Sequence, residues 1–364
     1  MQRREFMRQA GAAVAAFSVG GHAGRAEEED LNASHIPRWR GFNLQARFGP
    51  AADSYRESDF AIMAEWGFDF ARLPMSYWTW THRDSWLNIN DTALKDIDKA
   101  VEFGRQYGIH INLNFHRLPG YCINGRNLEP VDLFSGTEAE RAHALSAAVF
   151  HWKYFAQRYR GIPNRRLSFD LINEPPKMQS EDRYVEIVKA LVAGIREVDA
   201  NRLIFADGID IGQTPVMGIV ELGLVQSTRG YLPKAVSHYT ATWVPKDEFE
   251  TFKLPTWPLQ DDSGQIWNRD KIKQELYTKW KPIVDKGVQV HVGEWGCFNQ
   301  TPHDVTLAWM KDCLSIWKEA GWGFSLWELR GTFGVLDSER QDVKYEDYKG
   351  HKLDREMLEL LRSS

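Results

Sequence analysis

Residues 167–206 read LSFDLINEPPKMQSEDRYVEIVKALVAGIREVDANRLIFA, and this stretch indicates how the chain folds. Its two ends, residues 167–172 and 203–206, are short and apolar, which is typical of strands that are buried on both faces. Between them, apolar side chains recur at helical spacing: Tyr184, Ile187, Val188, Leu191, Val192 and Ile195. The stretch therefore predicts a strand, a helix and a further strand.

The same alternation continues on both sides of this stretch. Strand-like runs occupy residues 39–45, 68–75, 109–115, 167–172, 203–206, 235–239, 288–292 and 323–326. Further helical patterns occupy residues 94–107, 145–159, 272–284 and 305–320. Eight strands that alternate with helices predict an α/β fold, a single (β/α)8 TIM barrel. A doubly wound open sheet is the alternative, but neither GxGxxG nor GxxxxGK, the nucleotide-binding motifs common in such sheets, occurs.

The first residues have the pattern of an export signal. Arg3 and Arg4 precede a short apolar stretch and a small-residue exit near Ala26, which is typical of a signal peptide. The paired arginines resemble a twin-arginine signal, which implies a periplasmic or extracellular protein. A basic N-terminus on a cytoplasmic protein is the alternative. We expect a signal peptide at 1–26, a short acidic spacer at 27–36 and the catalytic domain at 37–364.

The composition of the 364-residue chain argues against several classes of protein. A formal net charge of -5 disfavours a nucleic-acid partner, and no apolar run reaches the ~18–20 residues that span a bilayer. Three cysteines without CxxC spacing, and the absence of an HExxH motif, predict neither a disulfide scaffold nor a metal site. The 15 tryptophans are many for a soluble chain; such side chains pack in cores or stack on flat ligands.

Two of the expected strands end in glutamate motifs, FDLINEPP at 169–176 and HVGEWG at 291–296. In a (β/α)8 barrel the C-terminal ends of the strands meet at one face, so Glu174 and Glu294 are expected at its mouth. Two carboxyl groups that face each other there suit glycoside hydrolysis. One of them protonates the leaving oxygen, and the other, ionised, attacks the anomeric carbon or activates water.

With these motifs, the sequence resembles glycoside hydrolase family 5, the cellulase family of retaining (β/α)8 glycosidases, from Arg40 onward. The resemblance implies that Glu174 is the general acid/base and Glu294 the nucleophile, with carboxyl groups ~5–5.5 Å apart. It also implies a monomer that needs no cofactor and acts on a β-glucan, and we expect an endo-β-1,4-glucanase. β-Mannanase or exo-β-glucanase activity is the alternative, and a non-catalytic carbohydrate-binding protein is a more distant one.

The resemblance extends to residues that would line the site. It implies that Arg72 keeps the nucleophile ionised and that Asn173 binds the sugar 2-hydroxyl. His116 and Trp327 correspond to the residues that contact the sugar in subsite -1, where Trp327 would form the floor. His238 matches the histidine that lies near the acid/base in this family.

The sixth strand departs from the family pattern. Many members carry His-x-Tyr there, and the tyrosine contacts the nucleophile, whereas this chain has His238-Tyr239-Thr240. A shift of one residue turns Tyr239 to the other face of a strand. Either a bulge restores the contact, or another group takes this role.

Several tryptophans are expected in loops at the mouth of the barrel: Trp78, Trp80, Trp243, Trp257, Trp267 and Trp295. Among them, Trp243 and Trp257 are expected to stack on sugars at outer subsites, and Trp295, beside the expected nucleophile, is a further candidate. The loop at 240–268 is long enough to form a wall of the cleft. Trp152, Trp280, Trp309 and Trp317 lie on helical patterns instead, where core packing is expected.

Overall fold

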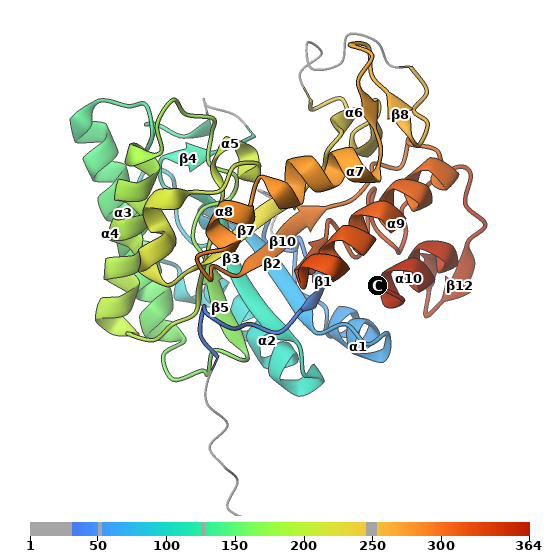
Figure 1. Ribbon diagram of the computed structural model, residues 1–364. Coiled ribbons are helices and arrows are strands. Elements are labelled where there is room, and N and C mark those ends of the chain that lie inside the picture. Colours follow the sequence, from blue (N-terminus) through green and yellow to red (C-terminus); the bar gives the residue numbers. More distant parts are fainter. Residues whose placement is uncertain (1–30, 50–52, 125–127, 245–252) are drawn as a thin grey trace, which may run out of the picture. The chain divides into compact units, whose positions relative to one another are not determined.

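The computed structural model describes residues 31–49, 53–124, 128–244 and 253–364 (Figure 1). Eight parallel strands follow one another around a barrel: β1 (Arg40–Asn43), β2 (Phe70–Ser76), β3 (His110–Leu118), β5 (Leu167–Asp170), β6 (Ile204–Asp207), β7 (Val225–Gly230), β10 (Val290–Trp295) and β11 (Gly323–Leu326). Because β1 pairs with both β2 and β11, and β2 also pairs with β3, the sheet is closed. The predicted (β/α)8 TIM barrel is confirmed.

Helices and small hairpins surround these strands. The longer helices are α1 (Glu57–Glu65), α2 (Asp91–Tyr107), α3 (Glu138–Arg158), α4 (Asp182–Val198), α9 (His303–Ala320) and α10 (Arg355–Arg362). Shorter ones are η1 (Tyr77–Thr79), α5 (Ile209–Gly212), η3 (Met217–Leu222), α6 (Lys234–Ser237), α7 (Arg269–Ile272), the π-helical η5 (Lys273–Thr278) and α8 (Lys281–Val284). The short strand β4 (Tyr121–Cys122) pairs with β3, and two hairpins join β8 (Leu259–Gln260) to β9 (Ile266–Trp267) and β12 (Glu346–Tyr348) to β13 (His351–Leu353).

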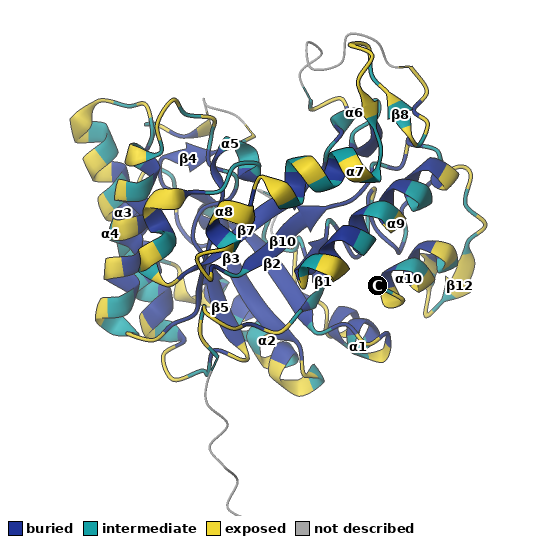
Figure 2. Cartoon of the chain, viewed as in Figure 1, coloured by how far each residue is buried: buried dark blue, intermediate teal, exposed yellow. Residues whose placement is uncertain are grey.

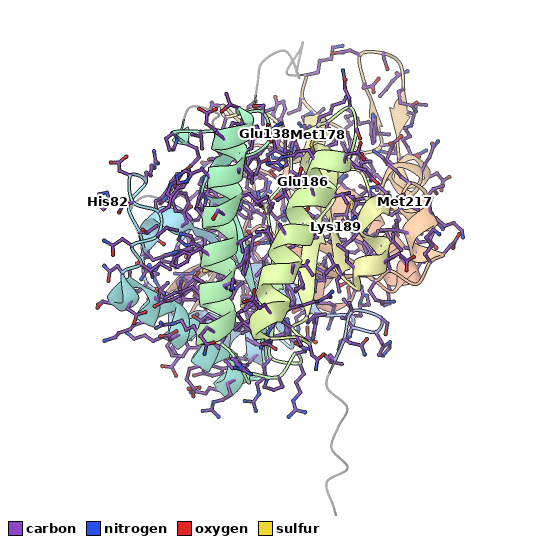
Figure 3. The ribbon with its side chains drawn as sticks, turned by 90° about the vertical axis from the view of Figure 1, so that its left-hand side faces the viewer. His82, Glu138, Met178, Glu186, Lys189 and Met217 are labelled. Carbon is purple, nitrogen blue, oxygen red and sulfur yellow. The ribbon has the colours of Figure 1, made fainter. Side chains whose placement is uncertain are left out.

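Local sequence explains where the main helices begin and end. At the start of α3, the Thr137 hydroxyl and the Glu140 carboxylate each accept a hydrogen bond from the other residue's backbone amide, which forms a capping box. At the end of α2, Gly108 adopts a left-handed conformation with φ of 70°. Helices α3 and α4 lie side by side, and the labelled Glu138 and Glu186 are on their exposed faces (Figure 3). In Figure 2 the barrel strands are dark blue, whereas the helices alternate between buried and exposed faces.

One of the predicted strands is wrong. Residues 235–239 contain most of α6, and the sixth barrel strand is β7, whose sequence VQSTRG has little apolar character. All six residues of β7 are buried, and their polar groups are bonded inside the fold. The Gln226 amide, for example, bonds both the N–H and the C=O of Val216, at 2.9 and 2.8 Å. A strand whose polar groups are satisfied in this way lacks the apolar run that marks buried strands in a sequence.

The N-terminal ends of the strands are closed by residues that precede β1. Ile36 and Trp39 pack against Phe70 and Phe205, and Trp39 stacks on the ring of His110 at 3.8 Å. The Asn164 amide also donates to the carbonyl of Leu31 at 2.8 Å. The compact unit therefore begins at Leu31, while the expected signal peptide and residues 27–30 of the expected spacer lie outside the described residues.

The remaining expectations about the chain concern its cysteines and its helices. Cys122, Cys297 and Cys313 are free and buried. Among the helices of the described ranges, none has both the length and the apolar character to cross a bilayer.

Candidate active site

The structure places Glu174 and Glu294 together at the C-terminal face of the barrel. Glu174 follows β5 in a left-handed conformation with φ of 49°, and its backbone N–H donates to the Asp207 carboxylate at 2.8 Å. The Tyr121 hydroxyl donates to the backbone carbonyl of Glu174. Glu294 lies on β10 just after a register shift at Gly293. A Cβ on Gly293 would lie 2.4 Å from the Ser227 hydroxyl, so the glycine of this motif leaves room for side chains of β7.

Arg72 on β2 is fully buried and contacts the expected nucleophile directly. Its Nη1 donates to Oε1 of Glu294 at 2.6 Å, and its Nε donates to Asp170 at 2.8 Å. The same side chain also donates to the side-chain oxygens of Asn43 and Asn173. The expected nucleophile is therefore held by a charge-assisted hydrogen bond to a permanent cation.

A second buried arginine, Arg229 on β7, was missed by the sequence analysis. Its Nε donates to Oε1 of Glu174 at 3.0 Å, and its Nη2 donates to Oδ1 of Asn173 at 2.9 Å and lies 3.6 Å from Oε1 of Glu294. Both of its terminal nitrogens also donate to the Asp207 carboxylate. One guanidinium group therefore contacts both glutamates.

The tyrosine that contacts Glu294 is Tyr231, and the expectation for Tyr239 is corrected. The buried Tyr231 hydroxyl donates to Oε2 of Glu294 at 3.2 Å. Tyr239 instead follows α6, well beyond the end of the strand. The spacing of His-x-Tyr occurs as Arg229-Gly230-Tyr231 at the end of β7, with an arginine in place of the histidine. The signal therefore lies on β7, upstream of the 235–239 strand that the sequence predicts.

His238, which was also expected at the end of the sixth strand, does not contact the acid/base glutamate. His238 lies with its ring 4.9 Å from the Tyr231 ring, and its Nδ1 is 2.8 Å from the Ser237 hydroxyl. Burial lowers the pKa of His238 to about 3, so the ring is neutral. The group that contacts the Glu174 carboxylate from β7 is Arg229, not His238.

One wall of the site is made of aromatic rings and an amide. The His116 ring lies 5.7 Å from the Trp327 ring and 4.6 Å from that of Phe48. Nδ1 of His116 is 3.9 Å from Glu294, and its Nε2 is 3.4 Å from the Asn173 amide nitrogen. Burial and the nearby arginines lower the pKa of His116 well below its ordinary value, so its ring is neutral. His116, Asn173 and Trp327 are thus brought together beside the glutamates.

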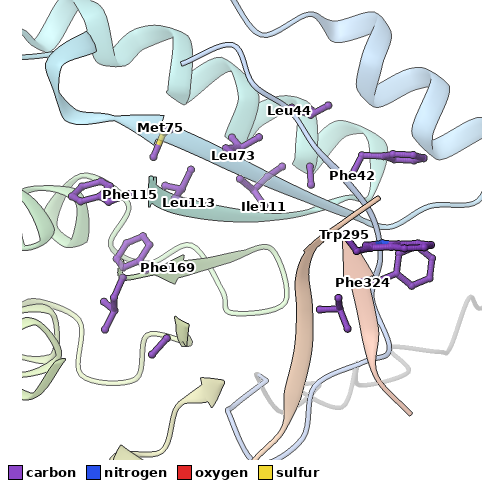
Figure 4. Close-up of a cluster of buried hydrophobic side chains, with 14 of the residues drawn as sticks. Phe42, Leu44, Leu73, Met75, Ile111, Leu113, Phe115, Phe169, Trp295 and Phe324 are labelled. Carbon is purple, nitrogen blue, oxygen red and sulfur yellow. The ribbon is translucent and has the colours of Figure 1, made fainter. Parts of the chain in front are cut away.

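The expectation that Trp295 stacks on sugar is wrong. Its side chain is fully buried, with its ring 4.5 Å from Trp317 and 5.4 Å from Phe324. Figure 4 shows Trp295 beside Phe324 within the cluster of buried apolar side chains. Successive side chains of a strand point to opposite faces, so Glu294 faces the mouth of the barrel and Trp295 faces α9.

The other loop tryptophans fall into two groups. Trp243 is 55% exposed and its ring lies 4.9 Å from that of Phe298, so it remains available for stacking. Trp80 is buried in the core. Trp257, which was expected to stack on sugar at an outer subsite, packs against the core, and its indole donates to Asp312 on α9 at 2.9 Å. The indole of Trp267 donates to Asp261 at 3.0 Å. Residues 245–252 of the expected cleft wall lie outside the described residues.

The charges of the site explain how the two glutamates differ. Burial and the charge of Glu294 raise the pKa of Glu174 to about 7, although Arg229 opposes this shift. Burial and Asp207 also raise the pKa of Asp170. Glu174 is therefore suited to hold a proton, whereas Glu294 is paired with the permanent cation of Arg72 at 2.6 Å. In the described part of the chain, no group of three or more His, Cys, Asp or Glu side chains is arranged to hold a metal ion.

Comparisons with known proteins identify the family and the fold of the chain. The sequence profile of cellulase (glycosyl hydrolase family 5) matches residues 29–332. A crystal structure of a glycoside hydrolase is 36% identical, with a TM-score of 0.83, over 90% of this chain and 99% of that one. Endoglucanase C of Acetivibrio thermocellus is 23% identical over 313 residues, which cover 80% of this chain and 88% of the relative. Endoglucanase Cel5A of Thermotoga maritima, at 19% identity and a TM-score of 0.69 over 89% of this chain and 96% of that one, shares the fold.

Proposed function

Because the chain belongs to the cellulase family, glycosyl hydrolase family 5, and is therefore a hydrolase of glycosidic bonds, we propose that it is a retaining endo-β-1,4-glucanase. The observation that carries this proposal is the contrast between the two glutamates at the barrel mouth. Glu294 is paired with Arg72 at 2.6 Å, whereas Glu174 has a pKa raised to about 7. An ionised nucleophile and a protonated acid are the two groups that double displacement needs.

In the first half-reaction, the Glu294 carboxylate attacks the anomeric carbon. The bond from that carbon to the leaving oxygen breaks, and Glu174 gives its proton to this oxygen. Arg72 and the Tyr231 hydroxyl hold the two Glu294 oxygens, at 2.6 and 3.2 Å, so the carboxylate is oriented before it attacks.

In the second half-reaction, Glu174 is ionised and takes a proton from water. The water oxygen attacks the anomeric carbon, the ester bond to Glu294 breaks, and Glu294 leaves as a carboxylate. Two inversions at the same carbon give net retention. The proton that Glu174 gave to the leaving group is thereby replaced.

Asn173 is oriented to bind the substrate. Its Oδ1 accepts hydrogen bonds from Arg72 at 2.8 Å and from Arg229 at 2.9 Å. Because arginines only donate, the amide atom that faces them must be the oxygen and not the nitrogen. Its Nδ2 is therefore directed away from them, where it can donate to the sugar 2-hydroxyl. Contacts to that hydroxyl strengthen in the transition state.

The substrate is best identified by a panel of polysaccharides. Carboxymethyl-cellulose and barley β-glucan should release reducing sugar, with a rapid fall in viscosity that marks internal cleavage. Mannan and laminarin should be poor substrates. Cel5A of Thermotoga maritima has been crystallised with mannotriose as well as cellobiose, so glucomannan belongs in the panel. Preferred cleavage of mannan, or release of short products alone, would contradict the endoglucanase assignment.

We also propose that the chain is exported by its twin-arginine segment. The support is the Arg3-Arg4 pair followed by a short apolar stretch. In a host with this pathway, replacing both arginines with lysine should retain the precursor in the cytoplasm. Export of that variant at the original rate would rule out this route.

A further inference from the structure

Arg229 carries a permanent positive charge, and of the side chains described above it is the one cation that contacts both proposed catalytic carboxyl groups. Its guanidinium lies 3.0 Å from Oε1 of Glu174 and 3.6 Å from Oε1 of Glu294, and the residue is fully buried. The position corresponds to the histidine of His-x-Tyr, which is neutral when it is buried. Unlike a neutral histidine, the permanent charge of Arg229 favours the ionised form of the neighbouring Glu174 carboxyl group.

The surroundings of Arg229 hold it in place. Its terminal nitrogens donate to both oxygens of Asp207, and Nη1 also donates to the Ser227 hydroxyl at 3.1 Å. The backbone closes around it, because a Cβ on Gly212 would lie 2.6 Å from the Arg229 Cγ and one on Gly293 would lie 2.8 Å from its Nη1. The guanidinium therefore stays beside Glu174 throughout the cycle.

The charge of the catalytic pair moves during the reaction. Before the first step the negative charge is on Glu294; in the glycosyl-enzyme, Glu294 is an ester and the charge is on Glu174. Arg72 contacts Glu294, while Arg229 contacts both groups. The charged and titratable groups that act on Glu174 directly are Glu294 on β10, Arg229 on β7, Tyr231 just after β7, Asp207 on β6 and Tyr121 on β4. Arg72 on β2, Asp170 on β5 and His116 on β3 belong to the same hydrogen-bonded cluster, because Arg72 contacts Asp170 and Asn173, and Asn173 lies beside His116. Once Glu294 is esterified, the strongest repulsion of an ionised Glu174 is removed and its contact with Arg229 remains.

We propose that Arg229, held by Asp207, is a positioning residue that serves as the counter-ion of Glu174 in the glycosyl-enzyme and so promotes the second half-reaction. The inference rests on the proposed function above. Arg229 keeps Glu174 ionised when it must take a proton from water. In the resting enzyme, the charge of Glu294 offsets the effect of Arg229, so Glu174 can still hold its proton for the first step.

The test measures the second half-reaction by itself. With 2,4-dinitrophenyl β-cellobioside the leaving group needs no proton, so hydrolysis of the glycosyl-enzyme limits kcat. The kcat then rises with pH as Glu174 ionises in the intermediate. Arg229→Met keeps the bulk of the side chain and removes its charge, so it should move this rise to higher pH by about one unit or more. At pH values below the midpoint, such a shift lowers kcat about tenfold. Arg229→Lys, which keeps a positive charge, should show a smaller shift.

Two comparisons separate this role from a structural one. Azide needs no general base, so it should restore turnover of Arg229→Met. Arg202→Met removes another buried arginine, which bonds Asp199 and backbone carbonyls at the opposite end of the barrel, and should lower stability without moving the midpoint. If Arg229→Met does not fold, Arg229→His, which restores the family pattern, should show the same shift.

An unchanged midpoint in folded Arg229 variants, or an equal loss of kcat at every pH, would overturn the inference. Glu174→Ala serves as the reference. Azide should rescue this variant and give a β-glycosyl azide. If Glu174→Ala instead keeps the activity of the wild type and azide has no effect on it, the proposed function and this inference would both be overturned. Normal rescue of Glu174→Ala beside an unshifted Arg229→Met would overturn the inference alone.

Discussion

The hydrogen bond from Tyr231 to Glu294 allows a quantitative prediction for Tyr231→Phe. In the second half-reaction Glu294 leaves as a carboxylate, so a hydroxyl 3.2 Å from its Oε2 stabilises charge as it develops. Hydrogen bonds to charged groups contribute about 1.5–3 kcal/mol, and the charge is only partly formed in the transition state. A loss of about 1–2 kcal/mol corresponds to a decrease of about 5- to 30-fold in kcat.

The assay is kcat for 2,4-dinitrophenyl β-cellobioside, with the melting temperature measured in parallel. Burial and the nearby carboxylates raise the pKa of Tyr231 well above its ordinary value, so the hydroxyl donates at every pH used. Tyr239→Phe is the matched control and should leave kcat unchanged. Equal losses in both variants, or no loss in Tyr231→Phe, would refute the reasoning.

Three further results are expected. Trp243→Ala should raise KM for cellohexaose more than for cellotriose, because the Trp243 ring is 55% exposed and free to stack. Trp257→Ala should raise neither KM, because the Trp257 indole is bonded to Asp312. Equal effects of Trp243→Ala on the two substrates would contradict this prediction. For substrates with poor leaving groups, kcat/KM should fall above about pH 7, since burial and Glu294 raise the pKa of the required acid Glu174 to about 7; a fall that begins near pH 5 would not fit. Burial raises the pKa of Glu328 to about 8, so its contribution to stability is complete below its ordinary pKa and is lost as the pH rises through about 8. Glu328→Gln should remove up to about 3–5 kcal/mol of the stability that is lost between the ordinary pKa of Glu328, 4.5, and about pH 8, as measured by urea unfolding. A variant with the same pH profile as the wild type would refute this role of Glu328.

Most of the barrel could be predicted from the sequence, because buried parallel strands are apolar runs. Residues 167–172 and 203–206 match β5 and β6 for this reason. The exception, β7, is buried but polar, since its side chains bond one another and the backbone inside the barrel. Hydrophobicity cannot identify such a strand, and the nearby apolar residues 235–239 give a misleading strand signal because they belong to a short helix and the loop after it. The helix expected at 272–284 is interrupted by a π-helical segment, which a 3.6-residue periodicity does not reveal.

The candidate site was predictable where a motif coincided with a correctly placed strand end. Glu174, Glu294, Arg72 and His116 meet in the structure because the four strands that carry or precede them were correctly placed. Arg229 and Tyr231 were missed with their strand, and Tyr239 was considered in place of Tyr231. Trp295 was assigned to the cleft, although the alternation of side chains along β10 directs it into the core.

The central claim is that Glu294 forms a covalent bond to the sugar, and trapping of that intermediate tests it most directly. A 2-deoxy-2-fluoro β-cellobioside with a dinitrophenolate leaving group should inactivate the enzyme, because fluorine slows hydrolysis of the glycosyl-enzyme more than its formation. Mass spectrometry of the digested protein should then find one added fluorocellobiosyl group, on the peptide that contains Glu294. A label on another carboxylate, or inactivation without any covalent label, would contradict the account.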